Sequence, residues 1–134
     1  MMQVRGALMA VVCLPLLAQA AGESTWQAEA MGAALSHRGV VASSKLLAPP
    51  HKVSGVITQV YWRYSLFSLP PDRLEVKLCT QTQCVIVDGQ QGVTSAFAGQ
   101  PANQPFHFVW GVYGRGSLYP VMRVRANQVI VNYR

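Results

Sequence analysis

Two cysteines set within alternating apolar and polar residues constrain the fold of this chain more than any other feature. Residues 74–78 read LEVKL, with apolar residues at every second position, which is typical of a half-buried β-strand. Cys79 follows, then the polar residues TQTQ, then Cys84 and the apolar residues VIV. The turn pair Asp88-Gly89 ends this second run. The pattern predicts a β-hairpin with a four-residue loop.

The pairing register of this hairpin follows from its apolar residues. If Cys79 lies opposite Cys84, Leu78 lies opposite Val85, and the flanking apolar residues share their face. Directly opposed residues of antiparallel strands have Cβ atoms about 4.5–5.5 Å apart, close to the reach of a disulfide. The register that buries the apolar face therefore also joins the cysteines. We predict a structural disulfide between Cys79 and Cys84, and expect it to contribute about 2 kcal/mol on the entropy model.

The first twenty residues have the layout of a secretory signal peptide. Arg5 precedes an apolar run from Gly6 to Ala18, which is shorter than the roughly 20 apolar residues that span a bilayer. Ala18-Gln19-Ala20 then provides the small residues that a signal peptidase requires. We predict that residues 1–20 are a cleaved signal peptide and that residues 21–134 form one exported domain. An uncleaved N-terminal anchor is the alternative, disfavoured by the short run.

Removing residues 1–20 changes the composition of the chain. Of 134 residues 114 remain, with ten Lys and Arg against five Asp and Glu, a net charge of +5. Cys13 is lost, so that the odd cysteine count becomes an even pair, as suits an exported protein with a disulfide. This length fits a single domain. We expect no membrane insertion after signal cleavage, because no later segment is long and apolar enough.

Short strands separated by Gly, Pro and Asn recur along residues 21–134. The sequence predicts an all-β, small, single-domain antiparallel sandwich or barrel of about six to eight strands. Besides the hairpin, the strands expected from the pattern cover residues 53–67, 106–113, 117–125 and 129–133.

Four segments carry more specific expectations. Residues 23–34 are the best place for a short helix, although Trp26 is expected to pack on the domain. Residues 33–42 suggest one strand with Leu35 and Val41 on the same face. Residues 88–105 are expected to be a long loop around a phenylalanine. Residues 126–128 are expected to form a short turn between the last two strands.

The few carboxylates leave little from which to build a catalytic site. Glu75 and Asp88 are expected across the hairpin from one another, and paired carboxylates about 5 Å apart are what a retaining glycosidase uses. A solvated hairpin end explains the same pair more simply. The chain has no G-x-S-x-G motif, no free cysteine after signal cleavage, and no clustered histidines. We therefore expect no enzymatic activity, no cofactor and no metal.

Binding is the better-supported class of function. Arg123 and Arg125 share a strand face, Arg115 precedes them and Arg134 follows, which suggests a basic patch. In an exported protein such a patch favours an acidic protein, lipid headgroups or a cell-wall polymer over nucleic acid. The alternative is that these arginines simply keep one sheet face hydrated. The last strand, residues 129–133, is also a candidate exposed edge for strand addition.

Aromatic residues suggest a carbohydrate-binding platform as an alternative function. Alternation within the strands places many of them in the core instead, and this interpretation is favoured. The residues concerned are Tyr61, Trp62, Tyr64, Trp110, Tyr113 and Tyr119.

Several segments also resemble the FlhE family of flagellar proteins. The resemblance covers most of residues 21–134 and depends on combination and spacing, because none of the motifs is catalytic. The segments are Ala21-Gly22-Glu23 with Trp26, Arg38-Gly39-Val40, residues 53–64 with Trp62-Arg63-Tyr64, the LC-x4-C hairpin from Leu78 to Cys84, Phe108-Val109-Trp110, and RANQVIVNYR from Arg125 to Arg134.

This resemblance implies a periplasmic accessory protein of the flagellum. Family members are linked to flagellar assembly and swarming, and are thought to limit leakage through the flagellar export apparatus or to act as a periplasmic chaperone for exported subunits. The implied partner is a flagellar rod or export-apparatus protein. The family provides no agreed functional residues, so none is transferred to this chain.

Overall fold

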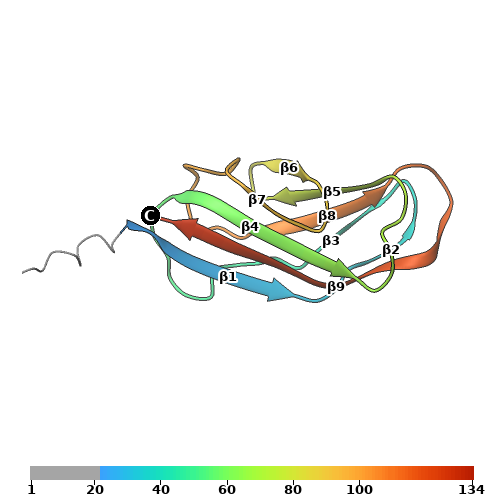
Figure 1. Ribbon diagram of the computed structural model, residues 1–134, viewed down its shortest axis with the longest axis horizontal. Coiled ribbons are helices and arrows are strands. Elements are labelled where there is room, and N and C mark those ends of the chain that lie inside the picture. Colours follow the sequence, from blue (N-terminus) through green and yellow to red (C-terminus); the bar gives the residue numbers. More distant parts are fainter. Residues whose placement is uncertain (1–21) are drawn as a thin grey trace, which may run out of the picture.

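Two antiparallel β-sheets packed face to face make up the computed structural model, which describes residues 22–134 (Figure 1). The predicted signal peptide, residues 1–20, lies outside the described residues. Within those residues no helix is long and apolar enough to cross a membrane. The strands are β1 (Ser24–Ala30), β2 (Ala34–His37), β3 (Val41–Ser43), β4 (Ile57–Leu66), β5 (Leu74–Cys79), β6 (Cys84–Val87), β7 (Gln91–Thr94), β8 (His107–Val112) and β9 (Ser117–Tyr133).

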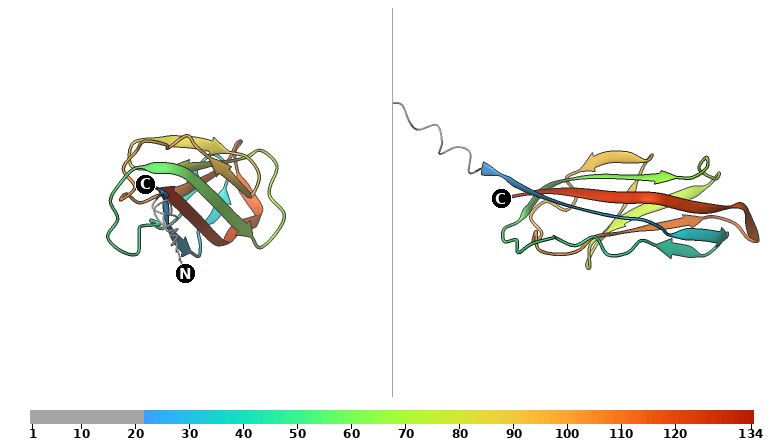
Figure 2. Two further views of the ribbon diagram at one scale, coloured as in Figure 1. Left: turned by 60° about the vertical axis from the view of Figure 1, so that its left-hand side comes forward. Right: turned by 90° about the horizontal axis from the view of Figure 1, so that it is seen from below.

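The predicted all-β sandwich is confirmed, and its topology joins strands that are distant in sequence. The first sheet has the order β1-β9-β4-β7, with β2 paired to the other half of β9. The second sheet has the order β3-β8-β5-β6. The described start of β1 and the C-terminus lie at one end of the elongated molecule, and the β8–β9 turn lies at the other (Figures 1 and 2).

The core between the sheets is built from the inward-facing residues of each strand. Trp62 and Tyr64 of β4 stack on one another, and both meet Phe108 of β8 edge-on. Trp26, Phe97, Phe106 and Trp110 are also buried. The prediction that Trp62, Tyr64 and Trp110 belong to the core is therefore confirmed.

The cysteine hairpin has the predicted register. Leu78 pairs with Val85 and Cys79 with Cys84 across β5 and β6, and the two cysteines form a disulfide. Cys79 is fully buried whereas Cys84 is exposed, so the bridge ties the edge strand β6 to the interior.

The last strand is central rather than peripheral. β9 runs unbroken over 17 residues, with β1 and β4 on either side of residues 127–133. The predicted turn at residues 126–128 is therefore wrong, and so is the idea of an exposed edge. Asn127 stays in the strand because it is buried and its Nδ2 donates a hydrogen bond to the carbonyl of Gly32 at 2.8 Å.

Three other local predictions are wrong for identifiable reasons. Residues 23–34 contain the strand β1 instead of a helix, because Trp26 alternates inward and pairs with Val131. Residues 33–42 split into β2 and β3 in different sheets. Gly39, with φ of +85°, turns the chain between them, so Leu35 is buried while Val41 is exposed. The expected loop 88–105 contains β7, which pairs with β4.

Candidate binding surface

The two carboxylates considered for catalysis do not share a cleft. Glu75 lines a depression on the outer face of the second sheet, with Lys77 and Tyr113. Asp88 lines a different depression, beside the loop that contains Asp72. Within residues 22–134 no three His, Cys, Asp or Glu side chains are grouped so that they could hold a metal ion. The geometry gives no support to a hydrolase centred on Glu75 and Asp88.

Glu75 instead forms a polar cluster on the sheet surface. The Tyr113 hydroxyl donates a hydrogen bond to Glu75 Oε2 at 2.9 Å, and Lys77 Nζ lies 4.0 Å from Glu75 Oε1. The hydrogen bond to this carboxylate raises the pKa of Tyr113, and the negative charge of Glu75 adds to the effect. Both contacts are solvent-accessible, so they order the surface more than they stabilise the fold.

The four arginines singled out from the sequence do not form one patch. Arg123 and Arg125 are exposed on β9, and Arg115 is exposed in the turn before it. Arg134 follows the other end of β9. It lies nine residues beyond Arg125, about 30 Å along an extended strand.

Two further arginines lie with Arg115 near the β8–β9 turn, while Arg123 and Arg125 lie further along β9. Arg38 follows β2, and its Nη1 donates a hydrogen bond to the carbonyl of Ser117 at 2.6 Å. Arg73 ends the β4–β5 loop, and its carbonyl accepts a hydrogen bond from the amide of Tyr113 at 3.2 Å. Sequence reasoning missed both because they lie in loops far from β9. We call this half of the molecule, which carries Arg38, Arg73, Arg115, Arg123 and Arg125, the arginine-bearing end.

Large apolar side chains protrude at this same end. Leu69 of the β4–β5 loop is 88% exposed, and Tyr119 of β9 is 92% exposed. Both line one depression with Arg38, with a volume of ≈ 310 Å³. Phe67 is 60% exposed, and the guanidinium of Arg125 lies 4.4 Å from the centre of its ring. The end is therefore both basic and apolar, which is unusual for a surface that contacts only water.

The three tyrosines that remain exposed do not share a face. Tyr61 lies on the outer face of the first sheet, Tyr113 adjoins the outer face of the second, and Tyr119 lies at the arginine-bearing end. The aromatic residues therefore form no extended carbohydrate platform.

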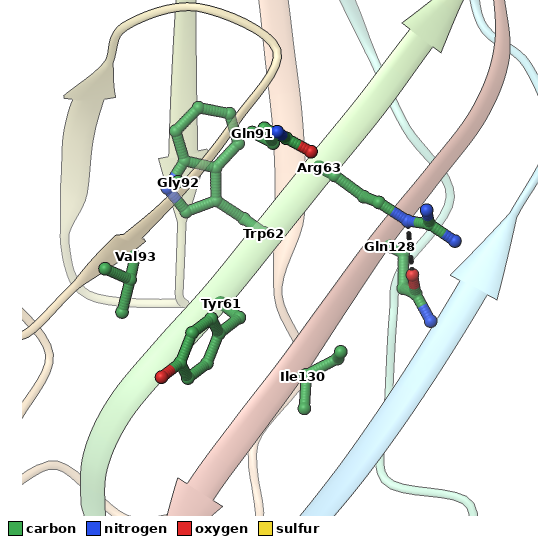
Figure 3. Close-up of a pocket in the computed structure, with 8 residues that line it drawn as sticks. All are labelled: Tyr61, Trp62, Arg63, Gln91, Gly92, Val93, Gln128 and Ile130. Atoms are coloured by element: carbon green, nitrogen blue, oxygen red, sulfur yellow. Dashed lines mark hydrogen bonds between the residues drawn. The ribbon is translucent and has the colours of Figure 1, made fainter.

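Tyr61 does lie in an open depression of ≈ 620 Å³ on the first sheet (Figure 3). Val93 and Ile130 flank its ring, and polar side chains continue the surface beside them. Arg63 Nε donates to Gln128 Oε1 at 2.6 Å, and Gln128 Nε2 donates to Gln27 on β1 at 2.9 Å. The depression thus combines one aromatic ring with a preorganised row of amide and guanidinium groups.

The buried side of this depression depends on a glycine. Trp62 points between the sheets, and its indole lies over Gly92 of the neighbouring strand β7. A Cβ atom on Gly92 would lie 2.8 Å from Trp62 Cζ2, closer than side-chain atoms pack. Gly92 is therefore required by the close approach of the indole rather than by a turn.

Comparison with known proteins agrees with the resemblance of the sequence segments. The family model described as "Flagellar protein FlhE" matches residues 32–134. A protein of that name from Salmonella typhimurium is 52% identical over 126 residues, which cover 94% of this chain and 97% of the relative. A protein of the same name from Escherichia coli K12 is 48% identical over 127 residues, covering 95% of this chain and 98% of the relative.

Solved structures lead to the same family. A crystal structure of FlhE superposes with a TM-score of 0.82 at 53% identity, covering 84% of this chain and 98% of that one. A serine protease of Aeromonas sobria superposes with a TM-score of 0.63 at 10% identity, over 29% of its own length, which shows a shared fold alone. Since both the family model and near full-length relatives match, this chain belongs to the FlhE family of flagellar proteins.

Proposed function

We propose that this chain is a non-enzymatic periplasmic accessory protein that binds a flagellar rod or export component. In this role it acts as a chaperone or regulator of flagellar export and assembly, and it limits leakage through the export apparatus. Family membership supports the flagellar role. The scattered carboxylates and the lack of a grouped metal-ligand set within residues 22–134 direct the function toward binding.

The arginine-bearing end is the observation that carries this proposal. Arg123 and Arg125 project from β9 next to Phe67, and no carboxylate among the described residues forms an ion pair with either guanidinium. Arginine recognises carboxylates in a bidentate manner, and it remains charged at any physiological pH. An exposed arginine pair beside an aromatic ring suits a partner with acidic and apolar side chains.

Complementation of a strain lacking the gene tests this assignment. We expect Arg123→Glu/Arg125→Glu to fail to restore motility and normal flagellar placement, because the reversed charges repel an acidic partner. Lys52→Glu/Arg134→Glu is the matched control, since both residues are exposed and the variant changes the net charge equally on other parts of the surface. Full restoration of motility and flagellar placement by Arg123→Glu/Arg125→Glu would exclude these two arginines as the binding surface. Immunoblots must show equal periplasmic levels of both variants.

Crosslinking in the periplasm identifies the partner directly. A photo-crosslinking residue at position 123 is expected to trap a flagellar rod or export protein, and the same residue at position 134 is expected not to. Recovery of the chain by osmotic shock tests the periplasmic location at the same time. Retention of the chain in the cytoplasm would contradict the proposed export.

Binding to the cell wall is a second candidate, favoured by the depression around Tyr61. An aromatic ring beside Gln and Arg side chains offers a stacking surface and hydrogen bonds to a sugar. A pull-down with purified peptidoglycan, using Tyr61→Ala and the control Tyr113→Ala, separates this candidate from the first. Absence of salt-insensitive binding, or equal loss in both variants, would count against it.

A further inference from the structure

We propose that the tip of the arginine-bearing end docks on the surface of an anionic phospholipid bilayer. The tip consists of Leu69 and Pro70 in the β4–β5 loop and Tyr119 and Pro120 at the start of β9, with Arg38 beside them. The proposal rests on the proposed function, because it names a second contact of the same end of the molecule. It separates the tip from Arg123 and Arg125, which lie further along β9.

The apolar part of the tip is built by two distant segments held in place by the core. Leu118 and Met122 are buried, so β9 is anchored on both sides of Tyr119 and directs that ring outward. Leu69 comes from a loop fifty residues earlier, yet it lines the same depression as Tyr119. The two most exposed large apolar side chains among residues 22–134 therefore line the same depression.

The shape of the tip favours a bilayer over a folded protein. Leu69 and Tyr119 line their depression yet remain 88% and 92% exposed, so neither side chain is enclosed by it. A protein partner would need preformed pockets to bury such projections, as interface hot spots require. A fluid bilayer admits them without one, and tyrosine prefers the boundary between acyl chains and headgroups.

The charge of the tip selects an anionic surface. Arg38 lines the depression with the apolar residues, Arg73 ends the same loop as Leu69, and Arg115 lies in the turn before β9. The chain's three lysines after residue 21 lie elsewhere in the sequence. Guanidinium groups bind phosphate oxygens in a bidentate manner, and each basic residue close to an anionic leaflet adds attraction. Asp72, Asp88 and Glu75 line depressions at or beside this end, so the five arginines of the arginine-bearing end outnumber its three carboxylates.

The overall shape leaves the rest of the surface free when the tip is docked. The C-terminus and the described start of β1 lie at the opposite end, as Figure 1 and the right-hand view of Figure 2 show. The depression around Tyr61 lies on the side of the sandwich, on β4, β7 and β9 (Figure 3). A molecule standing on its tip can therefore still present this sheet face to another partner.

Co-sedimentation of the purified full chain with vesicles tests the proposal. We expect binding to vesicles of phosphatidylcholine with phosphatidylglycerol, weakening as salt rises, and little binding to phosphatidylcholine alone. Arg115→Gln should weaken this partitioning about fivefold, the equivalent of about 1 kcal/mol. Arg134→Gln, the matched control at the opposite end, should leave it unchanged. Equal binding to both vesicle types, or equal effects of the two variants, would overturn the proposal.

The apolar contact is tested separately from the charges. Leu69→Ser/Tyr119→Ser should weaken partitioning at least about tenfold, because two side chains no longer enter the boundary region. In Tyr119→Trp, the emission of the new indole should shift to shorter wavelength with anionic vesicles only. An unshifted emission would show that the tip stays in water. Displacement by inorganic phosphate beyond chloride at equal ionic strength would show a free phosphate site, and would also overturn the proposal.

These outcomes are distinguishable from failure of the proposed function. If the chain does not bind vesicles and Arg123→Glu/Arg125→Glu fails to restore motility, the bilayer contact is overturned and the proposed flagellar partner stands. A chain that binds anionic vesicles as expected, while that variant restores motility fully, upholds the bilayer contact and removes Arg123 and Arg125 from the flagellar role.

Discussion

Replacing Gly92 by alanine tests the close approach of Trp62 to β7. The new Cβ atom would lie 2.8 Å from Trp62 Cζ2 and 3.1 Å from Cε2. The indole cannot easily retreat, since it is 5% exposed, stacks on Tyr64 and meets Phe108 edge-on. Overpacking of this kind costs about 1–3 kcal/mol. We therefore expect Gly92→Ala to lower the free energy of unfolding by about that amount, measured as a lower urea midpoint with an unchanged slope.

Gly111→Ala is the matched control for this prediction. Gly111 also lies within a strand, and its added Cβ would lie 3.1 Å from Val41 Cγ1. The Val41 side chain is 67% exposed, so it can rotate away, and the free energy of unfolding should change by less than about 0.5 kcal/mol. Equal urea midpoints for Gly92→Ala and Gly111→Ala would refute the reasoning.

A double-mutant cycle locates the source of the strain. Trp62→Phe removes the ring that contacts position 92, so Gly92→Ala should cost less in that background than in the native chain. We expect a coupling free energy of about 1 kcal/mol or more, within the range for residues in contact. Strict additivity would mean that alanine destabilises β7 through its backbone and not through the indole.

Three other predictions concern the bridge, the surface cluster and the buried amide. Without reductant the folded chain should be lighter by two hydrogens than its reduced form, and a free-thiol mass would falsify the bridged hairpin. Cys79→Ala/Cys84→Ala should lower the free energy of unfolding by about 2 kcal/mol. Glu75→Gln should lower the pKa of Tyr113 toward its ordinary value of 10.0 in a spectrophotometric titration. Because that pKa is raised, the contribution of this contact to stability is present below pH 10 and is lost as the pH rises through the folded value. Asn127→Ala should cost about 1 kcal/mol in urea unfolding, because the part-buried carbonyl of Gly32 loses its hydrogen-bond donor.

Local patterns were enough to predict the elements whose burial follows from their own sequence. The Cys79–Cys84 register, the inward side of Trp62 and Tyr64, and the all-β class each follow from alternation within a few residues. These predictions are confirmed because strand periodicity does not depend on which strand lies next to it.

Predictions failed where the answer depends on a distant partner. Asn127 has turn propensity, but the strands on both sides of β9 and the carbonyl of Gly32 hold it in an extended conformation. β7 has little pattern of its own, and Gly92 belongs to a strand because β7 pairs with β4, whose Trp62 lies over it. The arginine-bearing end was predicted only in part for the same reason. Arg38 and Arg73 come close to it through turns, and the sequence does not show where those turns lie relative to β9.

The central position of β9 has a consequence for the order of folding. β1 and β2 pair with β9 and with no other strand of the described residues, so they stay without partners until the ninth strand has been made. The first sheet therefore cannot form progressively from the N-terminal side during synthesis. A chain that must wait in this way remains unfolded for longer, which suits the proposed export but exposes β1 to aggregation.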